Sequence, residues 1–346
     1  MFSFLENAKI GARIALALVL PIVGMLIFSG MTILDKRSVV SEMDSLQELA
    51  ELAPSISALV HELQKERGTS AVFIGSKGTK FVKELPEQWA LSSQVHADLN
   101  TALTSFNAKS FGTNLVNKVA TATEALDGLD ATRKGVEGRT ITVPKMAGYY
   151  TPTIAKLLKI VVEMAVLSTN AEVTKSITAY TSFLQGKERA GIERAMGGAG
   201  FGAGKFAPGI YRKFLQLIAM QNTFLSTFDI YASQEERDFL TNTVVGEDVD
   251  SVKRMRKIAI ESPITNSVEG ITGPKWFGTI TKKINLLKVV EDKVAGDLVD
   301  LTHDIRSSAN TTFMILLVFT LVLLAITAVL VTVIVRGITQ PIAGMT

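Results

Sequence analysis

Two long uncharged apolar stretches, one near each end of the chain, constrain its fold more than any other feature. They cover residues 14–34 and 307–335. Each is long enough to cross a bilayer core of roughly 30 Å, which takes about 20 helical residues. The sequence therefore predicts two transmembrane helices, one on each side of a middle domain over residues 35–306.

Positive charges flank these stretches on the sides that face the chain ends. Lys9 and Arg13 precede the first stretch and Arg336 follows the second. The positive-inside rule therefore favours both termini inside, although Lys36 and Arg37 weaken this assignment. The first stretch exceeds the apolar core of a signal peptide and lacks a clear cleavage site. We therefore expect an uncleaved anchor and a middle domain outside.

Charge and composition exclude several classes of function. The net charge is only +3 and no basic run is present, so a nucleic-acid partner is not indicated. The chain has no cysteine, which excludes disulfides, thiol nucleophiles and cysteine-bound metals. His61, His96 and His303 lie far apart, and no catalytic Ser-His-Asp or paired-carboxylate pattern stands out. We therefore expect no metal site, no cofactor and no enzymatic activity.

The middle domain has helical periodicity almost throughout. Apolar residues recur at three- and four-residue spacing over residues 56–74, 180–195 and 211–228, whereas the alternation typical of strands is rare. Glycine and proline fall at intervals suited to helix ends, namely at residues 75–78, Pro86, Gly112, 135–138, Pro144, 197–204, Pro208, Pro263 and 273–274. The sequence predicts an all-α fold of helical bundles, with helices of about 20–40 residues. The last helix is expected to start after Trp276 and to continue through the second apolar stretch.

A charge interrupts the apolar face of the first periodic run. On a helix that advances about 100° per residue, Arg67 falls near the middle of the face set by Ile56 and Leu63. Lys65 and His61 point to solvent on the same projection. Arg67 is therefore a charge at a position where a core residue belongs.

The second run repeats this anomaly. Arg194 falls on the apolar face that Tyr180 sets. Lys187 and Gly191 lie on that face as well, whereas Glu193 faces water. One arginine in each run is thus turned inward.

An inward arginine has two interpretations. Each could pair with a carboxylate on a neighbouring helix, and Glu66 and Glu188 at the edges of their faces could serve. Two arginines that face one core need either acids or a bound anion, because an unpaired buried charge costs several kcal/mol. A planar guanidinium suits a small planar oxyanion, which it holds through two hydrogen bonds. Arg67 and Arg194 are therefore a candidate anion site.

Two motifs contain these arginines. The first is LVHELQKERG at residues 59–68, followed by Ser70-Ala71, Phe73 and residues 76–78, and the second is KERAGIERA at residues 187–195, followed by small residues, Lys205-Phe206 and residues 211–214. They resemble the two signatures of the nitrate- and nitrite-sensing domain family. The resemblance extends over roughly residues 38–306.

This resemblance implies a fold and a ligand. It implies two stacked four-helix bundles in which Arg67 and Arg194 bind nitrate or nitrite. The residues expected around the anion are Glu66, Ser70, Lys187 and Gly191.

The glycine-rich residues 197–204 fit a nucleotide-binding loop only superficially. They follow a predicted helix rather than a strand, so the context of a dinucleotide fingerprint is absent. A phosphate loop fails because Ala199 stands in place of its first glycine and Phe206 in place of Ser or Thr. We interpret the stretch as close helix packing or a hinge. It also departs from the family signature, in which more alanine and leucine is expected.

The residues after the second apolar stretch add an output to this interpretation. Arg336, Ile338-Thr339 and Pro341-Ile342 resemble the start of a HAMP linker over residues 336–346, so an output domain is expected beyond Thr346. We expect the sensory half of a methyl-accepting chemotaxis-type receptor. It would be a membrane-embedded, multi-pass homodimer of the bacterial inner membrane with cytoplasmic signalling partners. Residues 1–13 would be cytoplasmic and the sensory domain periplasmic.

Other interpretations keep the same layout. The ligand could be a carboxylate metabolite or a partner protein, since an arginine pair binds carboxylates as readily as nitrate. The output could be a histidine kinase or a cyclase. A membrane-anchored enzyme domain is a further alternative, for which no catalytic constellation was found.

Overall fold

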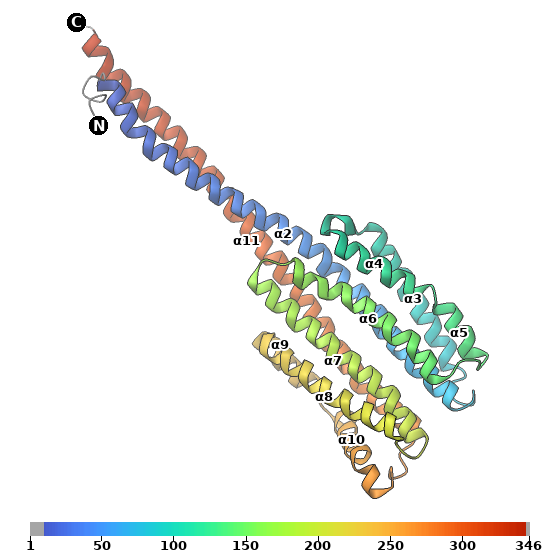
Figure 1. The fold of residues 1–346 in the computed structure, drawn as a ribbon. Helices are drawn as coiled ribbons and strands as arrows, with labels where there is room; N and C mark the ends of the chain where they lie inside the picture. The colour runs from blue at the N-terminus through green and yellow to red at the C-terminus, as the bar shows by residue number, and fades with distance from the viewer. Residues whose placement is uncertain (1–9, 344–346) are drawn as a thin grey trace. The chain divides into compact units, whose positions relative to one another are not determined.

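The computed structural model describes residues 10–343, which form helices and no strand (Figure 1). This confirms the all-α prediction. The first half of the chain comprises α2 (Ile10–Gly75), α3 (Glu84–Ser105), the 3₁₀ helix η1 (Ala108–Phe111), α4 (Thr113–Leu126), α5 (Leu129–Glu137) and α6 (Val143–Leu167). The second half comprises α7 (Ala171–Gly202), α8 (Pro208–Tyr231), α9 (Gln234–Thr243), α10 (Glu247–Thr265) and α11 (Gly273–Ala343).

The helices form two compact units. The larger unit contains residues 45–302, and the smaller one contains residues up to 44 together with those from 303 onward. In the smaller unit Arg306 of α11 forms an ion pair with Asp44 of α2. Apolar side chains of this unit are exposed, for example Phe28 and Ile315.

The boundaries predicted at residues 14–34, 307–335 and 336–346 fall within or beyond α2 and α11. Residues 1–9 and 344–346, which belong to the predicted N-terminus and linker, lie outside the described residues. These boundaries stay predictions. The final helix begins at Gly273, so that Trp276 lies in its first turn rather than before it.

Apolar faces of the predicted periodicity form the core of the larger unit. In α2, Ile56, Leu59 and Leu63 are fully buried. In α7, Tyr180 and Phe183 are likewise fully buried. Burial of each such side chain contributes about 1.5–3 kcal/mol, and these contacts hold α2 and α7 inside their bundles.

Helix ends mostly follow the predicted breakers. Thr142 caps the start of α6, two residues before Pro144. Its side chain accepts a hydrogen bond from the Lys145 backbone N–H. Ser233 and Glu236 form a capping box at the start of α9, which satisfies two backbone donors. Local sequence signals therefore set most of the helix boundaries.

The glycine-rich residues 197–204 do not break their helix, because α7 continues to Gly202. A Cβ atom at Gly197 would lie 2.3 Å from the Trp276 ring, and one at Gly200 would lie 2.3 Å from Phe206. These distances support close helix packing rather than a hinge. The aromatic rings of Phe206, between α7 and α8, and of Trp276 in α11 occupy the space that larger side chains on α7 would need.

Candidate functional site

Arg67 and Arg194 both lie inside the larger unit, as the helical projection predicts. Arg67 is 1% exposed and Arg194 is 0% exposed. A Cβ atom on Gly191 of α7 would lie 3.1 Å from Arg67 Nη2, and one on Gly68 of α2 would lie 3.1 Å from Arg194 Nε. Each guanidinium therefore lies against a glycine of the other helix, and these glycines make room for both charges.

Arg67 has a carboxylate partner. Its Nη1 and Nη2 atoms donate to the two carboxylate oxygens of Glu188 at 2.8 and 3.2 Å, and Nη1 also donates to Thr151 Oγ1 at 3.0 Å. Gln64 Nε2 donates to the same carboxylate at 2.7 Å. The interpretation of an inward arginine as an ion pair is therefore correct for Arg67, and Glu188 is the acid.

Arg194 has neutral partners instead. Its Nη2 donates to the backbone carbonyl of Gln64 at 2.6 Å, and its Nη1 donates to Thr281 Oγ1 at 3.1 Å. The guanidinium carbon lies 4.9 Å from the centre of the Phe277 ring. No ion pair joins Arg194 to a carboxylate within the described residues.

Electrostatics at Arg194 reflect this arrangement. Burial and, to a smaller extent, the positive charge of Arg67 lower the pKa of the guanidinium to about 9, although the Glu188 charge acts in the opposite direction. A buried charge without a paired opposite charge is costly, by several kcal/mol. The site is therefore electropositive at Arg194.

Several polar atoms at this crossing are buried without a hydrogen-bond partner. They are Gln64 Oε1, Arg67 Nε, Ser70 Oγ and Arg194 Nε. Buried polar atoms in native structures usually have a partner, so each unpaired one calls for an explanation such as a ligand. Two free guanidinium N–H donors, one from each helix, are suited to the oxygens of a small anion.

A cavity of about 550 Å³ reaches Arg194. Gly68 and Phe277 line it together with Arg194, and Lys80 adds a second cationic side chain. The remaining lining is mainly small and apolar residues of α2, α7 and α11. This cavity offers a small ligand a way to the arginine.

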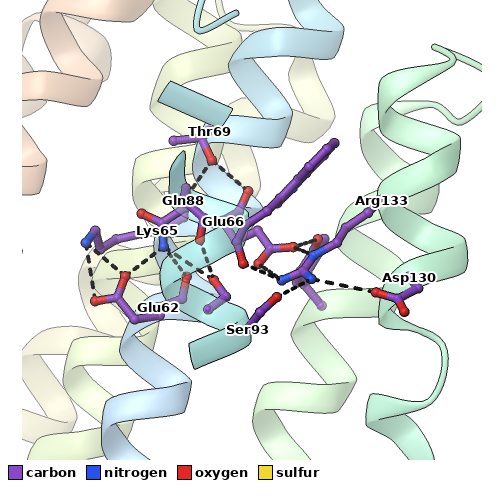
Figure 2. A network of polar contacts seen from close by, with 11 residues as sticks. Glu62, Lys65, Glu66, Thr69, Gln88, Ser93, Asp130 and Arg133 are labelled. Carbon is purple, nitrogen blue, oxygen red and sulfur yellow. Dashed lines mark hydrogen bonds and ion pairs between the residues drawn. The ribbon is translucent and has the colours of Figure 1, made fainter. Parts of the chain in front are cut away.

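The other predicted site residues divide into two groups. Gly191 of α7 lies beside Arg67, and Ser70 is buried on α2, the helix that contains Arg67. Glu66 and Lys187 have partners of their own. Figure 2 shows Glu66 bound by Arg133 of α5, through two hydrogen bonds of 2.8 Å.

Tyr150 completes the environment of Glu66, because its hydroxyl donates to the same carboxylate at 2.6 Å. Lys187 forms an ion pair with Glu291 of α11, with 2.5 Å between their nitrogen and oxygen atoms. Burial lowers the pKa of Lys187, whereas the Glu291 charge raises it. Neither Glu66 nor Lys187 is left free for an anion.

Two residues expected to face solvent are buried. His61 is 8% exposed and Glu193 is 0% exposed. Glu193 accepts hydrogen bonds from Arg256 Nε and Nη2 at 2.7 and 2.6 Å, and one from Gln221 at 2.7 Å. The projection assumed one apolar face per helix. For Glu193 it failed because α7 has bonded neighbours on several sides, in α2, α8, α10 and α11.

The fold and the two buried arginines define an all-α domain built around a basic pair at a helix crossing. Residues 58–299 match the family described as nitrate and nitrite sensing. The chain belongs to the nitrate- and nitrite-sensing family.

Two known proteins are similar to this chain over most of its length. A nitrate regulatory protein from Klebsiella oxytoca is 28% identical over 260 residues, which are 75% of this chain and 64% of that protein. The chain thus spans less than two thirds of this relative. The solved structure of the NasR transcription antiterminator is similar with a TM-score of 0.70 and 25% identity, over 81% of this chain and 80% of the other.

These relatives contradict the predicted chemotaxis function. One is a nitrate regulatory protein and the other a transcription antiterminator, and neither is a methyl-accepting chemotaxis receptor. The expected HAMP output and its kinase or cyclase alternatives are wrong on this ground, as are the carboxylate and partner-protein ligands. The resemblance of residues 336–342 to a HAMP start rests on a few spaced residues, too few to identify an output.

The predicted partners and location need the same correction. A transcription antiterminator among the similar structures contradicts the exclusion of a nucleic-acid partner and the membrane-embedded receptor. Within residues 10–343 one segment, Gly273–Ile334, is long and apolar enough to cross a membrane, by length and composition only. The two relatives, a nitrate regulatory protein and a transcription antiterminator, contradict the predicted multi-pass inner-membrane location. Apolar length alone does not establish a membrane span.

Proposed function

We propose that this chain is the ligand-binding part of a nitrate-responsive regulator and binds one nitrate or nitrite ion between Arg67 and Arg194. One observation carries the proposal: the Arg194 guanidinium is fully buried and bonded only to neutral groups. Membership of the nitrate- and nitrite-sensing family supports the choice of anion.

The geometry of the pair suits a planar anion. Arg67 Nε and Arg194 Nε are both free, and they come from two different helices. A trigonal oxyanion has three oxygens in one plane, so it can accept from both guanidinium groups at once. Binding would join α2 of the first half to α7 of the second.

The regulatory output that we propose is control of transcription. Its support is the pair of relatives, a nitrate regulatory protein and a transcription antiterminator. A nitrate-dependent change in the α2–α7 contact would be the signal that such an output reads.

Calorimetric titration of the purified full chain with sodium nitrate, sodium nitrite and sodium chloride tests the binding proposal. We expect saturable binding of nitrate or nitrite at one site per chain, and loss of that binding in Arg194→Gln. Arg254→Gln is the matched control, because Arg254 is an exposed arginine of α10. The proposal is wrong if the well-folded chain binds neither anion, or if Arg194→Gln binds as the parent does.

A further inference from the structure

The second half of the larger unit repeats the polar arrangement of the first. Glu66 and Arg67 are adjacent in α2, and Glu193 and Arg194 are adjacent in α7. In each half the glutamate is bound by an arginine from a later helix, through Nε and Nη2 in both cases. The two donors are Arg133 of α5 and Arg256 of α10.

The two inward arginines also have matching partners. Arg67 donates to a threonine hydroxyl of α6, and Arg194 donates to a threonine hydroxyl of α11. Glu66 and Glu193 are thus already neutralised within their own halves. The charges of Arg67 and Arg194 must therefore be balanced by other negative groups at the crossing.

The match fails at the acid that binds Arg67. Glu188 precedes Arg194 by the same number of residues as His61 precedes Arg67, which is six (194 − 188 and 67 − 61). Glu188 on α7 binds Arg67 on α2. The equivalent residue on α2, which would bind Arg194 on α7, is His61 in place of a glutamate.

His61 supplies no negative charge. Burial lowers its pKa far below the usual value, and the positive charges of Lys187, Lys65 and Arg194 lower it further. Its ring is therefore neutral near pH 7, and its Nδ1 atom has no hydrogen-bond partner. The crossing holds two guanidinium charges and one carboxylate charge, which leaves one positive charge.

We infer that Glu188 and His61 together limit the bound anion to one negative charge, so that the site selects monovalent over divalent oxyanions. This inference rests on the proposed function. With an acid at both positions the site would be neutral, and no positive charge would be left to attract an anion. With an acid at neither position it would carry two positive charges and would favour a divalent anion.

The first test changes His61. In His61→Glu a carboxylate would take the place of the anion at Arg194, so we expect nitrate affinity to fall at least about 100-fold, in the range seen for close charge pairs. His61→Gln, which is neutral, is the control and should bind within about threefold of the parent, a difference of under 1 kcal/mol. Nitrate binding by His61→Glu at the parent affinity would overturn the inference.

The second test changes Glu188. Glu188→Gln leaves two uncompensated guanidinium groups, so we expect the affinity for sulfate relative to nitrate to rise at least about tenfold, which corresponds to about 1.4 kcal/mol. Titrations of parent and variant with sodium sulfate and sodium nitrate measure this ratio. An unchanged ratio would overturn the inference even if nitrate still binds.

A measurement without any anion separates this inference from the proposed function. Because the new carboxylate pairs with a buried guanidinium, the thermal midpoint of His61→Glu in anion-poor buffer should exceed that of His61→Gln. If the parent binds no nitrate, the proposed function fails, but this difference still decides whether Arg194 lacks an acid. A midpoint of His61→Glu at or below that of His61→Gln would overturn the inference.

Discussion

At the scale of single residues, the acids and bases of the larger unit have separate tasks. Glu66 and Glu193 are each bound by an arginine of their own half and therefore stabilise the bundles. Removal of one member of such a pair leaves a buried charge, at a cost of about 3–5 kcal/mol. Arg194 is instead bonded to neutral groups, so its positive charge is in excess. An anion site that depends on such an excess charge needs a stable surrounding scaffold.

His61 gives the molecule a defined response to acid. Its pKa in the folded chain lies well below the usual value of 6.5. Below about pH 6.5 the unfolded chain therefore binds a proton that the folded chain does not, and the free energy of unfolding falls as the pH decreases. Between pH 7 and pH 5 the loss due to His61 is about 2 kcal/mol.

Urea unfolding of the parent and of His61→Gln at these two pH values measures this effect. The variant should lose less stability than the parent over the same interval. His303→Gln is the control, because His303 is exposed and should behave as the parent does. Equal losses in the parent and in His61→Gln would contradict a neutral buried His61.

At the scale of helices, the sequence predicted the elements well and their neighbours less well. Periodicity of 3.6 residues marks the buried face of α2 directly, and a charge on that face, such as Arg67, stands out without a structure. The partner of Arg67 does not, because Glu188 lies 121 residues further along the chain and only tertiary packing joins them. His61 and Glu193 were wrongly predicted to face solvent for a related reason. A projection onto one apolar face does not account for a helix that packs against neighbours on several sides.

The glycine-rich end of α7 shows how packing overrides local propensity. Several glycines in succession favour a helix end, yet α7 continues to Gly202 because aromatic rings pack where side chains would be. We therefore expect Gly197→Ala to destabilise the chain by about 1–3 kcal/mol, since its Cβ atom would lie 2.3 Å from Trp276. Chemical denaturation measures the change.

Gly198→Ala is the matched control on the same helix. A Cβ atom at Gly198 has no neighbour within 4 Å, so the variant should be neutral or gain up to about 1 kcal/mol from helix propensity. If the two alanine variants have the same stability, the packing of Trp276 against α7 does not hold the glycine-rich segment in its helix.

At the scale of the whole molecule, the candidate site lies where the two halves of the larger unit meet. Arg67 reaches from α2 to Glu188 on α7, and Arg194 reaches from α7 to the backbone of Gln64 on α2. An anion held by both arginines would therefore stabilise contacts in both halves at once. A ligand that binds only the folded state at 100 times its Kd adds about 2.7 kcal/mol to the free energy of unfolding.

Amide hydrogen exchange with and without saturating nitrate tests whether this stabilisation spans both halves. We expect slower exchange in α2 around Gln64 and in α7 around Gly191, because both segments contact the arginines, and no change in Arg194→Gln. Helix α9 and the exposed end of α10 should change little, since they contribute no residue to the crossing. Protection confined to α7 would mean that the anion binds Arg194 alone. In that case nitrate would neutralise the charge of Arg194 without linking the two halves, and a signal would have to arise within the second half.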